Sequence, residues 1–148
     1  MDPLRLVGTW DFVREIRHDD GAAYTADGEA RLLLEDDGRV RWAEQGTLRW
    51  AGGSTPVTRT LFLVRAAGPD GGALPDGGAD TGWRVTFEDG RDFHPWTAGT
   101  VEHLCGRDLY AGGLAVAAEP APAWELRWRV TGPEKAYLMH TRYTRPTR

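Results

Sequence analysis

The stretch Gly8-Thr9-Trp10-Asp11-Phe12-Val13-Arg14-Glu15-Ile16-Arg17-His18 alternates between two kinds of side chain. Trp10, Phe12, Arg14 and Ile16 fall on one face of an extended chain, and the other face is mostly polar or charged. Successive side chains of a β-strand point to opposite faces, so this alternation predicts a strand with one buried face. The first element of the fold is therefore expected to be a half-buried strand over residues 9–18.

Similar short segments recur along the chain and are separated by turn residues. Asp37-Gly38 and Asp89-Gly90 predict tight hairpins, because glycine accepts the positive φ that such turns require, and Gly46 predicts a bulge. The further expected strands lie at residues 29–34, 39–45, 57–64, 83–87, 91–96, 101–105, 109–116, 124–131 and 136–144. This spacing predicts an all-β antiparallel fold, a sandwich or an up-and-down barrel of about eight to ten strands, after a short N-terminal helical turn.

Length and composition limit the classes of function. The 148 residues fit a single domain, 1–148, with a flexible Gly-rich loop expected at residues 67–82. The net charge is −4 and the 18 cationic residues are dispersed among acids, which argues against nucleic acid as a partner. The chain shows no membrane-spanning apolar run and no secretion signal, and its one cysteine cannot form an intramolecular disulfide. A cytoplasmic bacterial protein without membrane contact, monomeric or homodimeric and free of cofactors, is expected.

The N-terminal residues Leu6-Val7-Gly8-Thr9-Trp10 resemble the Gly-x-Trp opening of calycins, the lipocalin-like superfamily of up-and-down β-barrels. The resemblance implies that Trp10 plugs the base of a barrel and that an arginine near the C-terminus stacks on its ring. Arg142 is the first choice for that arginine and Arg145 the second. With three further motifs, the chain resembles a small bacterial calycin-like family of unknown function. These motifs lie at residues 87–94, 103–110 and 132–137.

Two neighbouring strands carry a group of residues suited to proton transfer. By alternation, His94 and His103 face the same interior, and Gly106 allows a bend that brings Asp108 toward them, with Tyr110 beyond. Histidine titrates near neutral pH, and a carboxylate can fix its tautomer. Residues His94, His103, Asp108 and Tyr110 are therefore the predicted catalytic set of a cofactor-independent isomerase, cyclase or hydrolase.

Other interpretations of these residues remain open. Buried polar groups need partners whether or not they do chemistry, so the same set also fits a structural hydrogen-bonded network. His94, His103 and Asp108 match a two-histidine, one-carboxylate metal site in composition but lack a tight ligand spacing, and no metal is predicted. Cys105 is expected to pack as a small hydrophobe. His140 suits a haem ligand if the barrel is a non-catalytic carrier or sensor, and a filled barrel acting through its surface is a third reading.

The barrel interior is the expected ligand site. Arg14 shares the inward face of its strand, and Glu44, on the face of Trp42, is the candidate partner for its charge. Tryptophans fill a core by default, but Trp42, Trp96 and Trp128 are expected to line the cavity if the barrel is hollow. With Arg14 and Glu44 they form the predicted binding site for a small, partly apolar or aromatic organic molecule.

Overall fold

The computed structural model describes residues 2–65, 80–97, 99–117 and 123–146. Within them lie one turn of 3-10 helix and ten strands: η1 (Pro3–Leu6), β1 (Gly8–His18), β2 (Ala23–Leu34), β3 (Val40–Trp50), β4 (Gly53–Arg65), β5 (Asp80–Phe87), β6 (Asp92–Thr97), β7 (Gly99–Cys105), β8 (Asp108–Ala117), β9 (Ala123–Thr131) and β10 (Ala136–Thr144). A loop is expected at residues 67–82. Residues 67–79 of it lie outside the described residues, and residues 80–82 belong to β5.

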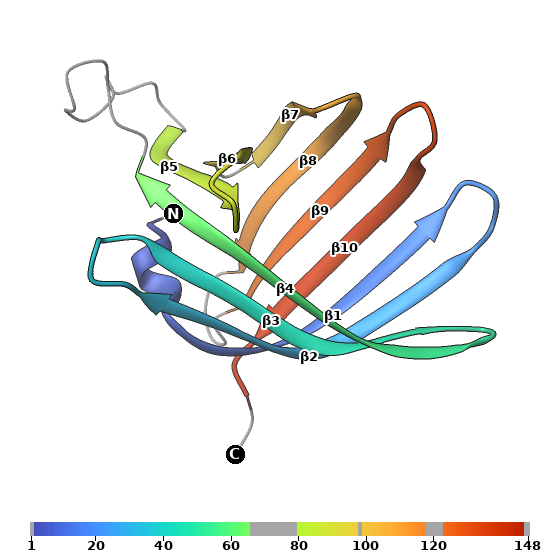
Figure 1. Ribbon diagram of the computed structural model, residues 1–148, viewed down its shortest axis with the longest axis horizontal. Helices are drawn as coiled ribbons and strands as arrows, with labels where there is room; N and C mark the ends of the chain where they lie inside the picture. The colour runs from blue at the N-terminus through green and yellow to red at the C-terminus, as the bar shows by residue number, and fades with distance from the viewer. Residues whose placement is uncertain (1, 66–79, 98, 118–122, 147–148) are drawn as a thin grey trace.

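The strands form one antiparallel sheet that curls into a nearly closed up-and-down barrel (Figure 1). Consecutive strands pair from β1 to β6 and from β7 to β10, and β1 pairs with β10. The two edge strands of this order, β6 and β7, lie beside each other at the seam of the barrel. The predicted all-β fold class is confirmed, and so is the up-and-down barrel, which the Gly8-Thr9-Trp10 opening favoured over a sandwich.

Strand β1 follows the predicted alternation, whereas β2 and β3 are longer than predicted. Strand β2 begins at Ala23, although an irregular lead-in was expected before residue 29. The bulge expected at Gly46 is absent, because Gly28 and Gly46 face each other in an unbroken register. A Cβ on Gly28 would lie 2.1 Å from the carbonyl oxygen of Gln45, so the two backbones approach more closely than side chains would allow. The close approach of the β2 and β3 backbones, and not a bulge, explains why glycine occupies both positions.

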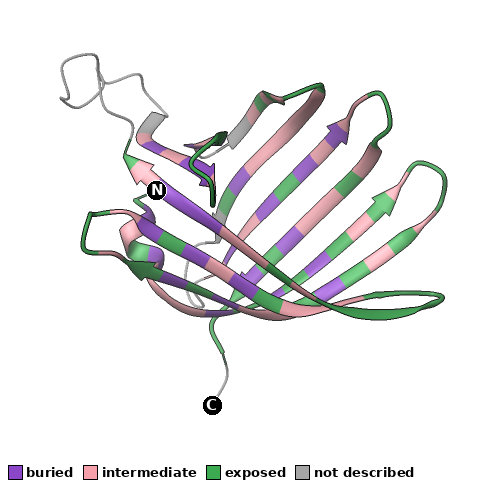
Figure 2. Ribbon diagram, viewed as in Figure 1, coloured by how far each residue is buried: buried purple, intermediate pink, exposed green. Residues whose placement is uncertain are grey.

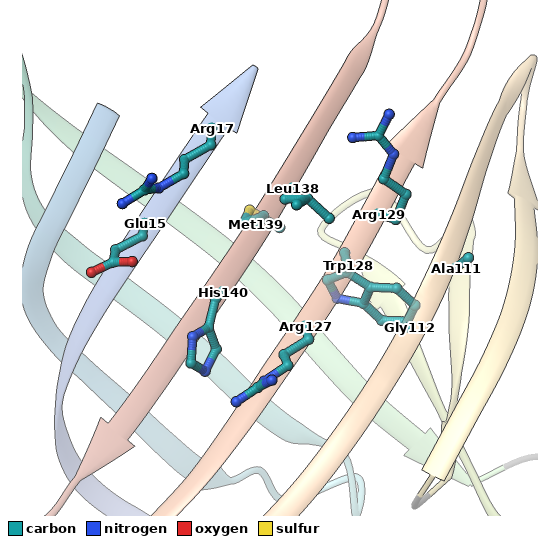
Figure 3. Close-up of a pocket in the computed structure, with 10 residues that line it drawn as sticks. All are labelled: Glu15, Arg17, Ala111, Gly112, Arg127, Trp128, Arg129, Leu138, Met139 and His140. Atoms are coloured by element: carbon teal, nitrogen blue, oxygen red, sulfur yellow. The ribbon is translucent and has the colours of Figure 1, made fainter. Parts of the chain in front are cut away.

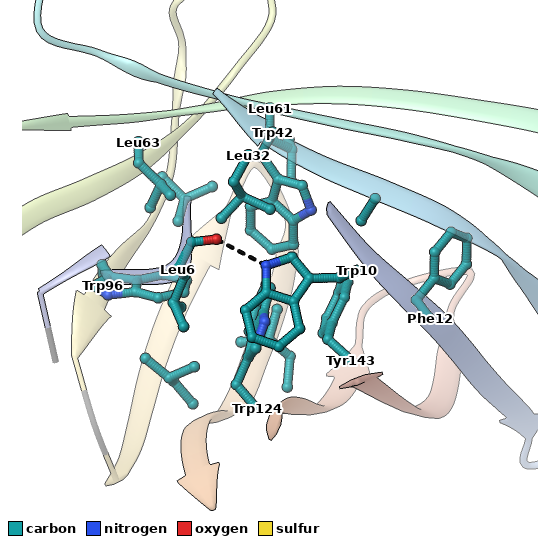
Figure 4. Close-up of a cluster of buried hydrophobic side chains, with 14 of the residues drawn as sticks. Leu6, Trp10, Phe12, Leu32, Trp42, Leu61, Leu63, Trp96, Trp124 and Tyr143 are labelled. Atoms are coloured by element: carbon teal, nitrogen blue, oxygen red, sulfur yellow. Dashed lines mark hydrogen bonds between the residues drawn. The ribbon is translucent and has the colours of Figure 1, made fainter. Parts of the chain in front are cut away.

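One end of the barrel is closed by η1 and by packed aromatic rings (Figure 4). The indole Nε1 of Trp10 donates a hydrogen bond to the carbonyl oxygen of Leu6 at 2.8 Å, which ties η1 across this end. Trp124 stacks on Tyr143 with ring centroids 3.8 Å apart and meets Trp10 edge-on at 6.1 Å. The described side chains at this end of the barrel therefore pack against one another.

The arginine that stacks on Trp10 is Arg145, not Arg142. The guanidinium carbon of Arg145 lies 3.8 Å from the ring centroid of Trp10. The first choice, Arg142, is wrong, because it alternates with the buried residues Thr141 and Tyr143 and therefore points outward, with 62% of its side chain exposed. The cation–π contact that the resemblance implies is present, but it comes from just beyond the last strand.

The opposite end of the barrel is its open mouth. The connections from β1 to β2, β3 to β4, β7 to β8 and β9 to β10 lie at this end (Figure 1). Buried positions become fewer toward it, and the ends of β3 and β4 there are exposed (Figure 2). A molecule entering the interior would come from this side.

Candidate functional site

A buried ion pair between Arg14 of β1 and Glu44 of β3 forms the polar centre of the barrel. The Nη2 of Arg14 donates to Glu44 Oε1 at 2.9 Å and to Oε2 at 3.2 Å. Its Nε donates to the hydroxyl of Thr141 on β10 at 2.8 Å. Both charged residues occupy inward positions of alternating strands, so the predicted pairing is confirmed. Its role in binding stays a prediction.

Glu44 also accepts hydrogen bonds from three other side chains. The hydroxyl of Tyr143 and the Nε1 of Trp42 donate to Oε2 at 2.5 and 3.1 Å. Arg59 on β4 reaches Oε1 with its Nε at 3.1 Å and its Nη2 at 3.0 Å. Burial opposes ionisation, but Arg59 and Arg14 outweigh it and lower the pKa of Glu44 below its usual value. Glu44 is therefore one carboxylate shared by two guanidiniums.

A pocket of about 240 Å³ adjoins this network on the side of the mouth, between strands β1 to β4. Its polar lining is Arg14, Glu44, Arg59 and Thr58. The rest of its lining is apolar and comprises Phe12, Ile16, Ala26, Leu48 and Val57. An apolar wall with a few convergent polar groups is the usual form of a small-molecule site.

Arg59 is the site residue that the sequence prediction missed. The alternation of β4 puts Arg59 on the same face as Leu61 and Leu63, which are 2% and 0% exposed. The sequence did contain a signal for Arg59, which is an arginine among apolar neighbours on the inner face of a strand. It indicates a cation that is held inside the barrel by a partner.

A bulge in β6 turns two consecutive side chains, Phe93 and His94, into the barrel. The register between β5 and β6 shifts between Val85 and Thr86, so that Phe93 is the extra residue. Phe93 and His94 are 6% and 2% exposed, and the Phe93 ring stacks on Phe87 at 4.7 Å. Simple alternation put Phe93 on the face opposite His94, and this prediction is wrong.

His94 is a buried neutral imidazole. Its Nδ1 lies 2.9 Å from the carbonyl oxygen of Pro95, and since a carbonyl only accepts, Nδ1 carries the hydrogen. Burial is the main cause that lowers the pKa of His94 to about 4, and the hydrogen bond to Pro95 opposes it. The nearby charges of His103, Arg59 and Arg84 lower it further. His94 is therefore uncharged at neutral pH.

The structure brings three of the four predicted catalytic residues to one wall, formed by β6, β7 and β8. His103 stands opposite Tyr110 in the register of β7 and β8. The rings of His94 and Tyr110 lie 4.7 and 5.9 Å from the ring of Trp128. Burial raises the pKa of Tyr110, and burial lowers that of His103.

The fourth residue, Asp108, pairs with a cation and does not orient an imidazole. Its Oδ2 accepts a hydrogen bond from the Nζ of Lys135 at 2.9 Å. Gly106, with φ at +64°, makes the turn between β7 and β8, and this turn leaves Asp108 at the mouth beside the β9 to β10 connection. The expected bend at Gly106 is confirmed, but the bend leads Asp108 to Lys135.

The space beside His94 is too small for a substrate. It has a volume of about 10 Å³, which is room for about one water molecule, and Arg59, Trp128 and Thr141 also border it. Arg59 lines both this void and the 240 Å³ pocket.

The tryptophans expected on the ligand wall belong to the packed core. Trp42, Trp96 and Trp128 are 1%, 0% and 3% exposed. Trp42 meets Trp96 and Trp124 edge-on at 6.3 and 5.4 Å, so ring packing takes up the volume that a hollow barrel would offer. The ligand-facing side chains of the pocket come from other residues of β1 to β4.

A wider hollow of about 360 Å³ lies across β1, β10, β9 and β8, among side chains that include Arg127 and Leu138 (Figure 3). His140 lines it on the outer face of β10, and its Nε2 lies 2.9 Å from Glu125 Oε2. A histidine on the outer face cannot ligate a haem inside the barrel, so the haem role considered for His140 is wrong.

Two further results concern metals and membranes. Among the residues that the structure describes, no three His, Cys, Asp or Glu side chains gather so as to hold a metal ion. None of the described helical structure is long and apolar enough to cross a membrane.

Comparison with known proteins identifies a family whose function is unknown. The model of a family described as a family of unknown function, DUF6314, matches residues 6–145. No curated protein matches the chain. Solved structures that resemble it include a de novo design of a fluorescence-activating β-barrel, with 17% sequence identity, 99% of each chain covered and a TM-score of 0.48.

Proposed function

The chain belongs to the family of unknown function DUF6314, and we propose that its barrel binds a small, partly apolar organic molecule in the pocket beside Arg14, Glu44 and Arg59. The observation that carries the proposal is this pocket, about 240 Å³ in volume, with apolar walls and an ion-paired polar floor at the mouth of the barrel. The protein then acts as a carrier or sensor of that molecule.

The size and lining of the pocket limit what it can hold. Drug-sized ligands need roughly 300 Å³ or more, so a volume of about 240 Å³ suits a smaller molecule and is too small for haem. Ile16, Leu48 and Val57 offer apolar contact, whereas Arg59 and Glu44 offer charged partners. A ligand with one apolar part and one polar end satisfies both surfaces.

Acid–base chemistry is not part of the proposal. His94 borders a void with room for about one water molecule and is not among the residues that line the pocket. Asp108 is engaged by Lys135 at 2.9 Å. A general base must come within hydrogen-bond reach of the bound molecule, which this arrangement does not favour.

We also propose a distant relationship to calycins. The support is the Gly8-Thr9-Trp10 opening together with the closed end of the barrel, where the Arg145 guanidinium lies 3.8 Å from the ring centroid of Trp10. The up-and-down strand order agrees with that relationship.

The test is to fill the pocket and to ask whether binding disappears. Ala26 is 2% exposed and lines the pocket, so Ala26→Leu puts a larger side chain into the ligand's space. Ala43→Leu on the outer face of β3 is the matched control. We use 4-fluorobenzamide and 4-fluorobenzoate as fluorine NMR probes, because each has an aromatic body and one polar end.

At least one of the two probes should bind the wild-type protein and the Ala43→Leu control, and Ala26→Leu should abolish that binding. Val57→Phe, at another wall of the same pocket, serves if Ala26→Leu does not fold. Undiminished binding by a folded pocket-filling variant, or the absence of binding of both probes to the wild-type protein, would overturn the proposal.

A further inference from the structure

We infer that the molecule held in this pocket is a small monocarboxylate and that Arg59 binds its charged end. This inference rests on the proposed function and adds two points: the chemical class of the ligand and the residue that selects it.

The charges that line the pocket do not balance. Arg14 and Arg59 are both cations, because arginine does not lose its proton in proteins, and Glu44 is the one carboxylate among the described lining residues. Tyr143 donates to Glu44 as a neutral hydroxyl, since burial and the Glu44 charge raise its pKa. One positive charge therefore remains beside apolar walls. Such a charge is best compensated by a single negative charge.

The unbalanced charge belongs to Arg59 more than to Arg14. Arg14 bonds to Thr141, Glu44 and Tyr143, and only 10% of its side chain is exposed. The side chain of Arg59 is 31% exposed, and the atoms that reach Glu44 are its Nε and Nη2. The Nη1 edge of its guanidinium is thus the part that can serve a ligand.

Arg59 can turn toward a ligand without leaving a buried charge unpaired. Glu44 would keep the hydrogen bonds from Arg14, Tyr143 and Trp42 at 2.9, 2.5 and 3.1 Å. A buried carboxylate that retains a cation and two further donors stays satisfied. Arg59 is therefore the movable member of the network.

A carboxylate is the anion that fits this arrangement. A guanidinium presents N–H groups in a planar fork that matches the two oxygens of a carboxylate. The hydrocarbon part of the ligand would then pack against Ile16, Leu48 and Val57. A neutral amide of the same shape offers Arg59 an acceptor but no charge.

The test compares 4-fluorobenzoate with 4-fluorobenzamide on the full chain by fluorine NMR titration. A hydrogen bond to a charged group contributes more than a neutral one, so the benzoate should bind at least about tenfold more tightly than the benzamide. Arg59→Gln should abolish this preference, and Arg59→Lys should retain part of it. Arg49→Gln, an exposed arginine on the outer face of β3, should leave it unchanged.

The outcomes distinguish the monocarboxylate inference from the proposed binding function. If the benzamide binds the pocket as tightly as the benzoate, the monocarboxylate inference fails while the proposed function stands. If neither probe binds, the proposed function itself fails. A benzoate preference that survives in Arg59→Gln would overturn the role of Arg59. If Arg59→Gln does not fold, an undiminished preference in Arg59→Lys would count against bidentate binding by Arg59.

Discussion

Mild acid should destabilise the fold through His94. Burial holds the pKa of this imidazole at about 4 in the folded protein, compared with an ordinary value of 6.5. Because the folded-state pKa is depressed, the contribution of His94 to stability is complete above pH 6.5 and is lost as the pH falls toward 4. The unfolded chain takes up a proton in this range, whereas the folded protein does not.

The magnitude follows from the two pKa values. A pKa lowered from 6.5 to about 4 corresponds to about 3 kcal/mol of unfolding free energy when the transition is complete. About 2 kcal/mol of it should be lost between pH 7 and pH 5. A domain is stable by roughly 5–15 kcal/mol, so this loss is measurable. The pKa of Glu44 is lowered from 4.5. Its contribution to the unfolding free energy is therefore lost mainly below pH 4.5, outside the range from pH 7 to pH 5.

The assay is urea unfolding followed by tryptophan fluorescence at pH 7, 6 and 5. His94→Asn retains an amide donor for the carbonyl of Pro95 but cannot titrate, so its stability should fall less over this range than that of the wild-type protein. The reasoning is refuted if His94→Asn loses as much stability as the wild-type protein, or if NMR shows that the His94 imidazole titrates above pH 6.

Two further predictions concern the polar centre and the closed end. Glu44→Gln leaves the guanidiniums of Arg14 and Arg59 without their counter-charge and should cost about 3–5 kcal/mol in urea unfolding. Glu44→Leu combined with Arg14→Met and Arg59→Met removes all three charges and should recover most of that loss. A Glu44→Gln cost below about 1 kcal/mol would contradict the burial argument. Arg145→Ala removes the contact of Arg145 with Trp10 and should lower the free energy of unfolding by about 0.5–1 kcal/mol. Arg142→Ala should change the free energy of unfolding by less than about 0.5 kcal/mol. Equal effects of the two substitutions would argue against the contact.

Side-chain alternation was enough to predict the all-β class and the inward face of β1. It was also enough to predict the pair between Arg14 and Glu44, because two opposite charges on the inner faces of a closed sheet need each other. The Asp-Gly turns predicted two hairpins, since their backbone preference is local. These are properties of single strands and single turns.

Alternation failed wherever one residue changed the register or where several partners competed for one group. The extra residue in β6 turned Phe93 inward beside His94, and a period of two cannot show such a shift. Asp108 pairs with Lys135 and not with a histidine, because the turn at Gly106 leaves it beside the connection from β9 to β10.

What the sequence by itself determined about this protein is therefore which residues are extended, which face each one takes, and that a buried arginine requires a carboxylate. Only the tertiary structure decided that tryptophans fill the closed end, and that a second arginine, Arg59, shares Glu44 and leaves one positive charge at a small pocket. The physical reason is that alternation depends on neighbours along the chain. Packing volume and charge balance depend on strands that meet only when the barrel closes.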